Sequence, residues 1–298
     1  MENHLNVVPS GGDANDAVIS VNEPNGYGRI PENQAVPIRN RVSLRQSYIT
    51  IFSYILLITL SEITVAYYEP SYGIVLHGSL MFILFGHAAL LNPSDRDLSN
   101  LLMAIGIAPL IRIISLSTPL SSFSYIYWFL ILSVPLFAGI IILRYVQKLK
   151  EEDIGLTLNF RKLHLEIGIV LAGIPLGFLE YYILKPEPLI DEFTIQRLVA
   201  SVLIMVICTG LIKELIFRGL IQHNAVRVFG VRGGIAATSI LFGLLHIGNL
   251  SPPSVVFAAA VGVLFSIVVL RTKSIAGVSI AHGTLNCTLF LIVPTYFG

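Results

Sequence analysis

TGLIKELIFRG, residues 209–219, places three charged side chains inside a long apolar run. Lys213, Glu214 and Arg218 lie at a depth where an ionisable group usually faces the interior of a helix bundle, so they are functional candidates by default. A purely structural interpretation is also open. Glu214 and Arg218 stand four residues apart, which allows an ion pair along one helix face.

The composition predicts an all-α, polytopic membrane helical bundle. Of the 298 residues, 54% are hydrophobic and only 12% are charged, with a mean hydropathy of +0.78. Soluble domains carry about 25% charged residues. A net charge of +1 without a long basic run indicates no nucleic-acid partner.

Three domains and nine spans are expected, although the count of transmembrane helices could equally be eight. Residues 1–45 are polar and are predicted to form a disordered cytoplasmic tail. Residues 46–163 hold the N-terminal spans and an amphipathic cytoplasmic loop at 145–163, and residues 164–298 form a transmembrane core with motifs in 209–286. The spans, each near the ~20 residues that cross a bilayer, are 47–67, 72–92, 98–117, 123–144, 164–184, 198–222, 233–249, 254–271 and 275–296.

Basic residues set the orientation of these spans. With a cytoplasmic N-terminus, fourteen basic residues fall in cytoplasmic segments, and only Lys185 and Arg197 fall on the opposite side. The fourteen are Arg29, Arg39, Arg41, Arg45, Arg96, Arg144, Lys148, Lys150, Arg161, Lys162, Arg227, Arg232, Arg271 and Lys273. This bias predicts a cytoplasmic N-terminus and a C-terminus on the far side. We expect an integral membrane protein of a bacterial inner membrane.

Two features within the spans predict structural contacts. Arg112 lies near the outer end of the third span, where Glu62 and Glu180 are at similar depth, so an ion pair with one of them is expected. Gly173 and Gly177 are spaced for close helix contact.

Two later motifs, FGLLH at 242–246 and HGTLN at 282–286, match the depth of Glu214. The glycine-rich stretch at 229–234 predicts a reversal of the chain. Glu214 lies 16 residues before Gly230 and His246 lies 16 residues after it, so both stand about 24 Å from the turn. His282 and Asn286 share one face of a neighbouring helix. The four residues are therefore predicted to face one polar cavity that is reached from the cytoplasmic side.

Such a set can activate water at membrane depth. A carboxylate and a histidine accept its proton, while a second histidine and an asparagine stabilise an oxyanion. Peptide hydrolysis follows as the predicted chemistry, with Glu214, His246, His282 and Asn286 as catalytic residues. No cofactor is required, but Glu214, His246 and His282 could instead hold a divalent metal such as Zn²⁺. No HExxH motif supports that alternative.

The order ExxxR, FxxxH, HxxxN resembles the CPBP family of CAAX proteases and bacteriocin-processing enzymes, also called Abi. The resemblance covers about residues 196–298 and includes LIFRG and SIAHGTLN. It implies a type II CAAX prenyl endopeptidase-like fold and a membrane-anchored or lipidated peptide substrate. It also implies that Lys213, Arg218 and Phe242, which belong to the motifs, support the catalytic residues.

Lys213 departs from the family pattern EExxxR, whose first Glu activates the water together with the FxxxH histidine. Here that position reads Lys213 and the second reads Glu214. Three interpretations are open. Glu214 serves as the base, Lys213 acts in a deprotonated form, or proteolysis is lost and the cavity only binds a peptide or another membrane protein, as a scaffold or bacteriocin-immunity protein would.

Overall fold

The computed structural model describes residues 42–118, 125–190 and 194–297, and these ranges contain helices and loops but no strand. Nearly all of the predicted tail at 1–45 lies outside them, and a helix already begins at Leu44. The predicted all-α membrane bundle is confirmed by helices that are long and apolar enough to cross a bilayer. The protein is therefore an integral membrane protein.

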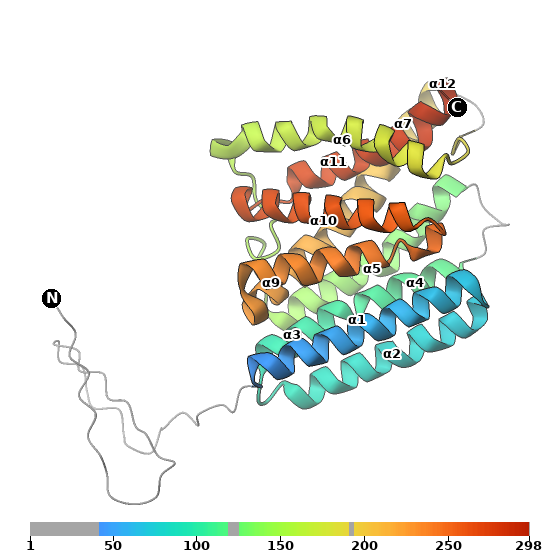
Figure 1. The fold of residues 1–298 in the computed structure, drawn as a ribbon. Helices are drawn as coiled ribbons and strands as arrows, with labels where there is room; N and C mark the ends of the chain where they lie inside the picture. The colour runs from blue at the N-terminus through green and yellow to red at the C-terminus, as the bar shows by residue number, and fades with distance from the viewer. Residues whose placement is uncertain (1–41, 119–124, 191–193, 298) are drawn as a thin grey trace, which may run out of the picture. The chain divides into compact units, whose positions relative to one another are not determined.

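The first part of the described chain consists of six helices (Figure 1). They are α1 (Leu44–Tyr67), α2 (Pro70–Leu91), α3 (Arg96–Ile105), α4 (Ile107–Ser117), α5 (Tyr125–Gln147) and α6 (Leu163–Leu184), the last preceded by a short 3-10 turn, η3 (Phe160–Lys162). Gly106 separates α3 from α4, and together these two form one candidate span, Arg96–Ser117.

The remaining part alternates between α-helical and π-helical turns. It comprises α7 (Ile195–Ile204), η4 (Met205–Leu211), α8 (Ile212–Glu214), η5 (Leu215–Gln222), α9 (His223–Leu244), η6 (Ile247–Asn249), α10 (Pro252–Thr272), α11 (Ala276–Cys287), η7 (Thr288–Ile292) and α12 (Val293–Tyr296). Of these, η4, η5 and η7 are π-helical, a form that is rare and often marks functional sites.

The described residues hold eight candidate spans, one of which, Ile195–Asn249, is 55 residues long. Gly230 interrupts it with φ 72° and ψ 177°, a backbone conformation that essentially only glycine adopts. The chain reverses there, because the rings of Phe217 and Phe242 lie 4.8 Å apart although 25 residues separate them. The predicted reversal is confirmed, and it explains why nine predicted spans correspond to eight continuous segments.

Helix ends that carry basic residues meet at one end of the bundle. The Val42 amide donates to Asp95 before α3, and Arg227 near the α9 reversal pairs with Asp97 at 2.9 Å. Asn159 donates to the Thr272 carbonyl at the end of α10. Helix ends that are far apart in sequence thus lie at the same end of the bundle. The distribution of basic residues predicted that these segments lie on one side of the membrane.

The loop after α5 is irregular and is hydrogen-bonded to the turn between α10 and α11. Gly155, with φ +74°, accepts a hydrogen bond from the Ile275 amide at 3.0 Å, and the Thr157 hydroxyl donates to the Lys273 carbonyl at 2.6 Å. The side chain of Ile154 is buried beneath this connection. The loop therefore fixes the start of α11, which carries the last motif.

Close contact between α6 and α11 follows from the glycine pair. A methyl group added at Gly173 would lie 2.6 Å from the Ala281 carbonyl oxygen, and one at Gly177 would lie 2.6 Å from that of Leu285. The predicted close approach is confirmed, and Figure 1 shows the two helices side by side.

Arg112 pairs with Glu62 rather than with Glu180. Its guanidinium donates to both carboxylate oxygens, with Nε 2.9 Å from Oε1. It also donates to the carbonyl oxygen of Leu245 at 3.1 Å, so α1, α4 and the end of α9 are joined. The expected ion pair is confirmed with one of its two candidate partners.

Candidate functional site

Glu214 lies at the junction of two π-helical stretches and is completely buried. Its carboxylate accepts from Arg218 Nη1, which is 3.1 Å from Oε1 and 3.0 Å from Oε2. Oε1 is also 2.7 Å from His282 Nδ1. The helix that carries the first motif is thereby linked to the helix that carries the last.

Arg218 is enclosed by aromatic rings and backbone. Its guanidinium lies 4.8 Å from the centroid of Phe242 and 5.5 Å from that of Phe265, and Nη2 donates to the Gly262 carbonyl at 3.1 Å. A buried charge is tolerated only when it is paired and hydrogen-bonded, so Glu214 is the counter-ion that Arg218 needs.

His246 lies just beyond the end of α9, where Arg112 holds the preceding residue. Its Nδ1 is 2.8 Å from the Phe242 carbonyl oxygen, which can only accept a hydrogen bond. Nδ1 therefore carries the proton, and the neutral ring leaves Nε2 as an acceptor. The same argument applies to His282, whose Nδ1 faces the Glu214 carboxylate.

Asn286 is oriented from the opposite wall by a threonine that the sequence motifs did not include. Its Nδ2 donates to Thr209 Oγ1 at 2.7 Å, and one of its two N–H bonds stays available. Thr209 in turn donates to the Met205 carbonyl. The hydroxyl at the start of TGLIKELIFRG thus fixes the amide.

His246, His282 and Asn286 line one small cavity of about 30 Å³, together with Lys213 and Glu180. That volume accommodates a water molecule. Glu214 is not among the lining residues and reaches the cavity only through His282. The structure thus brings three of the four predicted catalytic residues to one space and holds the fourth behind it.

Glu180 on α6 is the carboxylate of this cavity. Sequence analysis treated it only as a partner for Arg112. It lines the small cavity beside Lys213, and the two side chains interact electrostatically. The sequence did place the Glu180 carboxylate at membrane depth, which can mark a functional site. No sequence motif, however, links α6 to the helices that carry the other residues of this cavity.

A larger cavity of about 370 Å³ adjoins the small one, and Lys213 and His246 line both. Its walls are mostly apolar, with Trp128 and Leu132 of α5 among them. The exposed lining residues are Gly248 and Asn249, in the turn between α9 and α10. That turn lies at the opposite end of the bundle from the basic loops, and the expected approach to the small cavity from the cytoplasmic side stays a prediction.

No group of three or more His, Cys, Asp or Glu side chains in residues 42–118, 125–190 and 194–297 is placed to hold a metal ion. Both Glu214 oxygens lie within 3.1 Å of Arg218, and His282 Nδ1 bonds to one of them. Glu214, His246 and His282 therefore do not fit a shared metal.

Comparison with known proteins gives one match. Residues 195–288 match the family model described as type II CAAX prenyl endopeptidase Rce1-like, and this range contains all three motifs. No curated protein and no solved structure matches the chain. The resemblance drawn from ExxxR, FxxxH and HxxxN is thereby confirmed for about a third of the chain, because residues 195–288 match the Rce1-like family model.

Proposed function

We propose that this chain is a CAAX-protease-like membrane protein. It binds a membrane-anchored or lipidated peptide in the larger cavity of about 370 Å³, which Lys213 and His246 line, and hydrolyses it only weakly. One observation carries the proposal: Lys213 lines the cavity beside His246, whereas Glu214 is held away by Arg218 and His282. The ammonium stands where the family motif has its first glutamate.

Weak hydrolysis follows from the proton chemistry at this position. A general base must accept a proton from water within hydrogen-bonding reach. An ammonium group has three donors and no acceptor, so charged Lys213 cannot take this role. The acceptor left near the water position is Nε2 of His246, without the carboxylate that the family motif would place beside it.

Glu214 acts in this proposal as a positioning residue. Its carboxylate fixes the Nδ1–H tautomer of His282 and stabilises a charged imidazolium, as the carboxylate of a hydrolase triad does. When His282 carries a second proton, its Nε2–H and the Asn286 amide donate to the oxyanion that forms when water adds to the peptide carbonyl. Glu214 was predicted to be a catalytic residue, and in this proposal it acts indirectly, by positioning His282.

A second candidate function is efficient hydrolysis with Glu180 as the base. It is favoured because Glu180 lines the same small cavity as His246, His282 and Asn286. In that case Glu180 on α6 takes the role that the family motif gives to its first glutamate, and Lys213 balances the charge of Glu180.

The experiment uses the full chain in phospholipid vesicles with a farnesylated CAAX peptide, following release of the C-terminal tripeptide by mass spectrometry. We expect Lys213→Glu to raise the rate by about 10²–10⁴-fold, the usual contribution of general-base catalysis. Adding His246→Ala should remove the gain. A native protein that cleaves the peptide at a rate unchanged by Lys213→Glu would contradict the proposal.

A further inference from the structure

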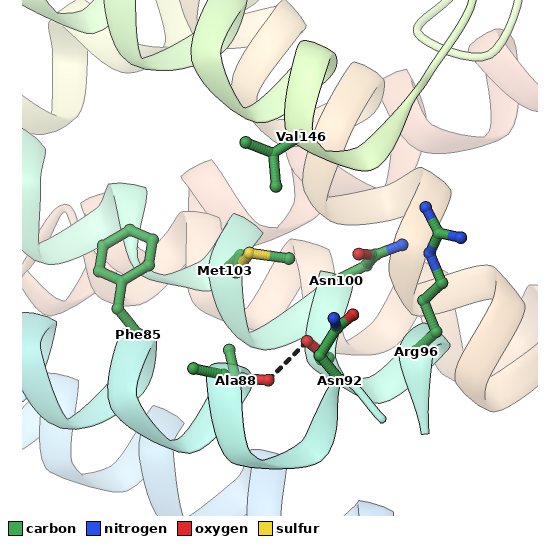
Figure 2. A pocket seen from close by; sticks show the side chains of 9 residues that line it. Phe85, Ala88, Asn92, Arg96, Asn100, Met103 and Val146 are labelled. Carbon is green, nitrogen blue, oxygen red and sulfur yellow. Dashed lines mark hydrogen bonds between the residues drawn. The ribbon is translucent and has the colours of Figure 1, made fainter. Parts of the chain in front are cut away.

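A cavity of about 350 Å³ lies between α2, α3 and α5, away from the Rce1-like motifs. It is placed where α2 ends, α3 begins and α5 ends, at the end of the bundle that carries the basic loops. Figure 2 shows its lining side chains, with Phe85 and Met103 toward one side and Arg96 and Asn100 toward the other.

The polar side of this cavity contains a buried amide that faces it. Asn100 is only 8% exposed, and its side chain points into the cavity (Figure 2). Its backbone carbonyl accepts from Gln147, but within the described ranges no hydrogen bond to its side-chain amide is found. The amide is not among the fully buried, unpaired side-chain groups of the described residues, so it is accessible to a ligand in the cavity.

Arg96 supplies the charge. Its exposed guanidinium lines the cavity, and no carboxylate of the described residues forms an ion pair with it. The neighbouring acids are engaged elsewhere, since Asp95 caps Leu98 and Asp97 pairs with Arg227. The cavity thus combines a cation with an amide donor, which suits a phosphate oxygen.

Part of the remaining wall is apolar and lies on the exposed side of the cavity. Phe85, Ala89 and Val146 are exposed lining residues, and the adjacent Leu90 is 81% exposed on the outer face of α2. A ligand with a phosphate at the membrane surface and a hydrocarbon chain in the bilayer matches this division. The basic end of the bundle is also where an anionic leaflet is expected to attract the protein.

We propose that this cavity binds the headgroup and upper acyl chain of an anionic phospholipid, with Arg96 and Asn100 donating to the phosphate and Phe85, Met103 and Val146 contacting the chain. The site is independent of peptide hydrolysis. It gives the N-terminal helices, which lie outside the Rce1-like match, a binding role of their own.

The test is native mass spectrometry of the full chain from detergent containing equimolar phosphatidylglycerol and phosphatidylcholine with identical acyl chains. We expect preferential retention of phosphatidylglycerol and a roughly fivefold loss of that preference in Arg96→Gln, the effect of one basic residue near a membrane surface. Arg45→Gln, an exposed arginine at the same end that does not line the cavity, should change nothing.

A second pair of variants keeps the charge unchanged. Ala89→Trp fills the exposed side of the cavity and should reduce retention of the lipid, whereas Leu90→Trp, on the neighbouring residue outside the cavity, should not. Equal retention of the two lipids, or equal losses in Arg96→Gln and Arg45→Gln, would overturn the proposal. Displacement of the lipid by inorganic phosphate or by glycerol 3-phosphate alone would also overturn it and would indicate a site for soluble phosphate.

Discussion

His282 Nδ1 lies 2.7 Å from Glu214 Oε1, although 68 residues separate the two along the chain. This contact joins the first and last motifs of the segment that matches the Rce1-like family model. It also engages one of the two oxygens of the Glu214 carboxylate, and this carboxylate does not line the small cavity. The identity of the carboxylate that meets water is therefore the central question at this site.

Glu180→Gln separates the two proposed functions. If weak hydrolysis is correct, the substitution should leave the low native rate unchanged within about twofold, because no carboxylate base is in use. If Glu180 is the base, the rate should fall by about 10²–10⁴-fold. The measurement is tripeptide release from the farnesylated peptide, with Glu187→Gln, in the loop after α6, as a control that should have no effect.

Glu214→Ala should destabilise the fold strongly. It leaves the Arg218 guanidinium buried without its counter-ion, and breaking a buried pair in this way costs about 3–5 kcal/mol. Lys213→Ala removes a side chain that lies near Glu180 but forms no salt bridge with a carboxylate of the described residues, and it should cost about 1 kcal/mol or less. The free energies of unfolding in detergent, measured side by side, test the difference, and equal losses would contradict it.

Gly177→Leu should separate α6 from α11. The added side chain would meet the Leu285 carbonyl and the Thr288 side chain, and overpacking of this kind typically costs about 1–3 kcal/mol. Because α11 carries His282 and Asn286, the activity of a Lys213→Glu background should fall as well. Gly168→Leu is the matched control on the same helix, since nothing lies within 4 Å of its position.

Orientation and access can be measured together. Fourteen basic residues against two predict that position 298 and the cavity mouth at Asn249 are outside, whereas the loop at 148–159 is inside. A membrane-impermeant maleimide should therefore label Asn249→Cys in intact cells, in a background without Cys208 and Cys287, and should not label Glu152→Cys. The reverse pattern would refute the orientation.

The fold was largely predictable because bilayer thickness fixes the length of each span. The depth of the motifs was predictable for the same reason, since a reversal at Gly230 makes Glu214 and His246 level. Which helix face points inward was not predictable, because the π-helical turns of η4 and η5 change the angular spacing on either side of Glu214. Glu180 was missed as a cavity residue because only tertiary packing brings α6 to the motifs.

The contact between α6 and α11 also bears on where this protein can be divided. Residues 195–288 can be recognised by sequence, yet α6 ends at Leu184 and supplies Gly173, Gly177 and the cavity residue Glu180 from outside that range. A fragment beginning at residue 195 would expose the backbone carbonyls of Ala281 and Leu285 to lipid in place of a tightly fitting helix. The segment that matches the family model is thus smaller than the unit that packs together, and any transplant of this segment should begin before α6.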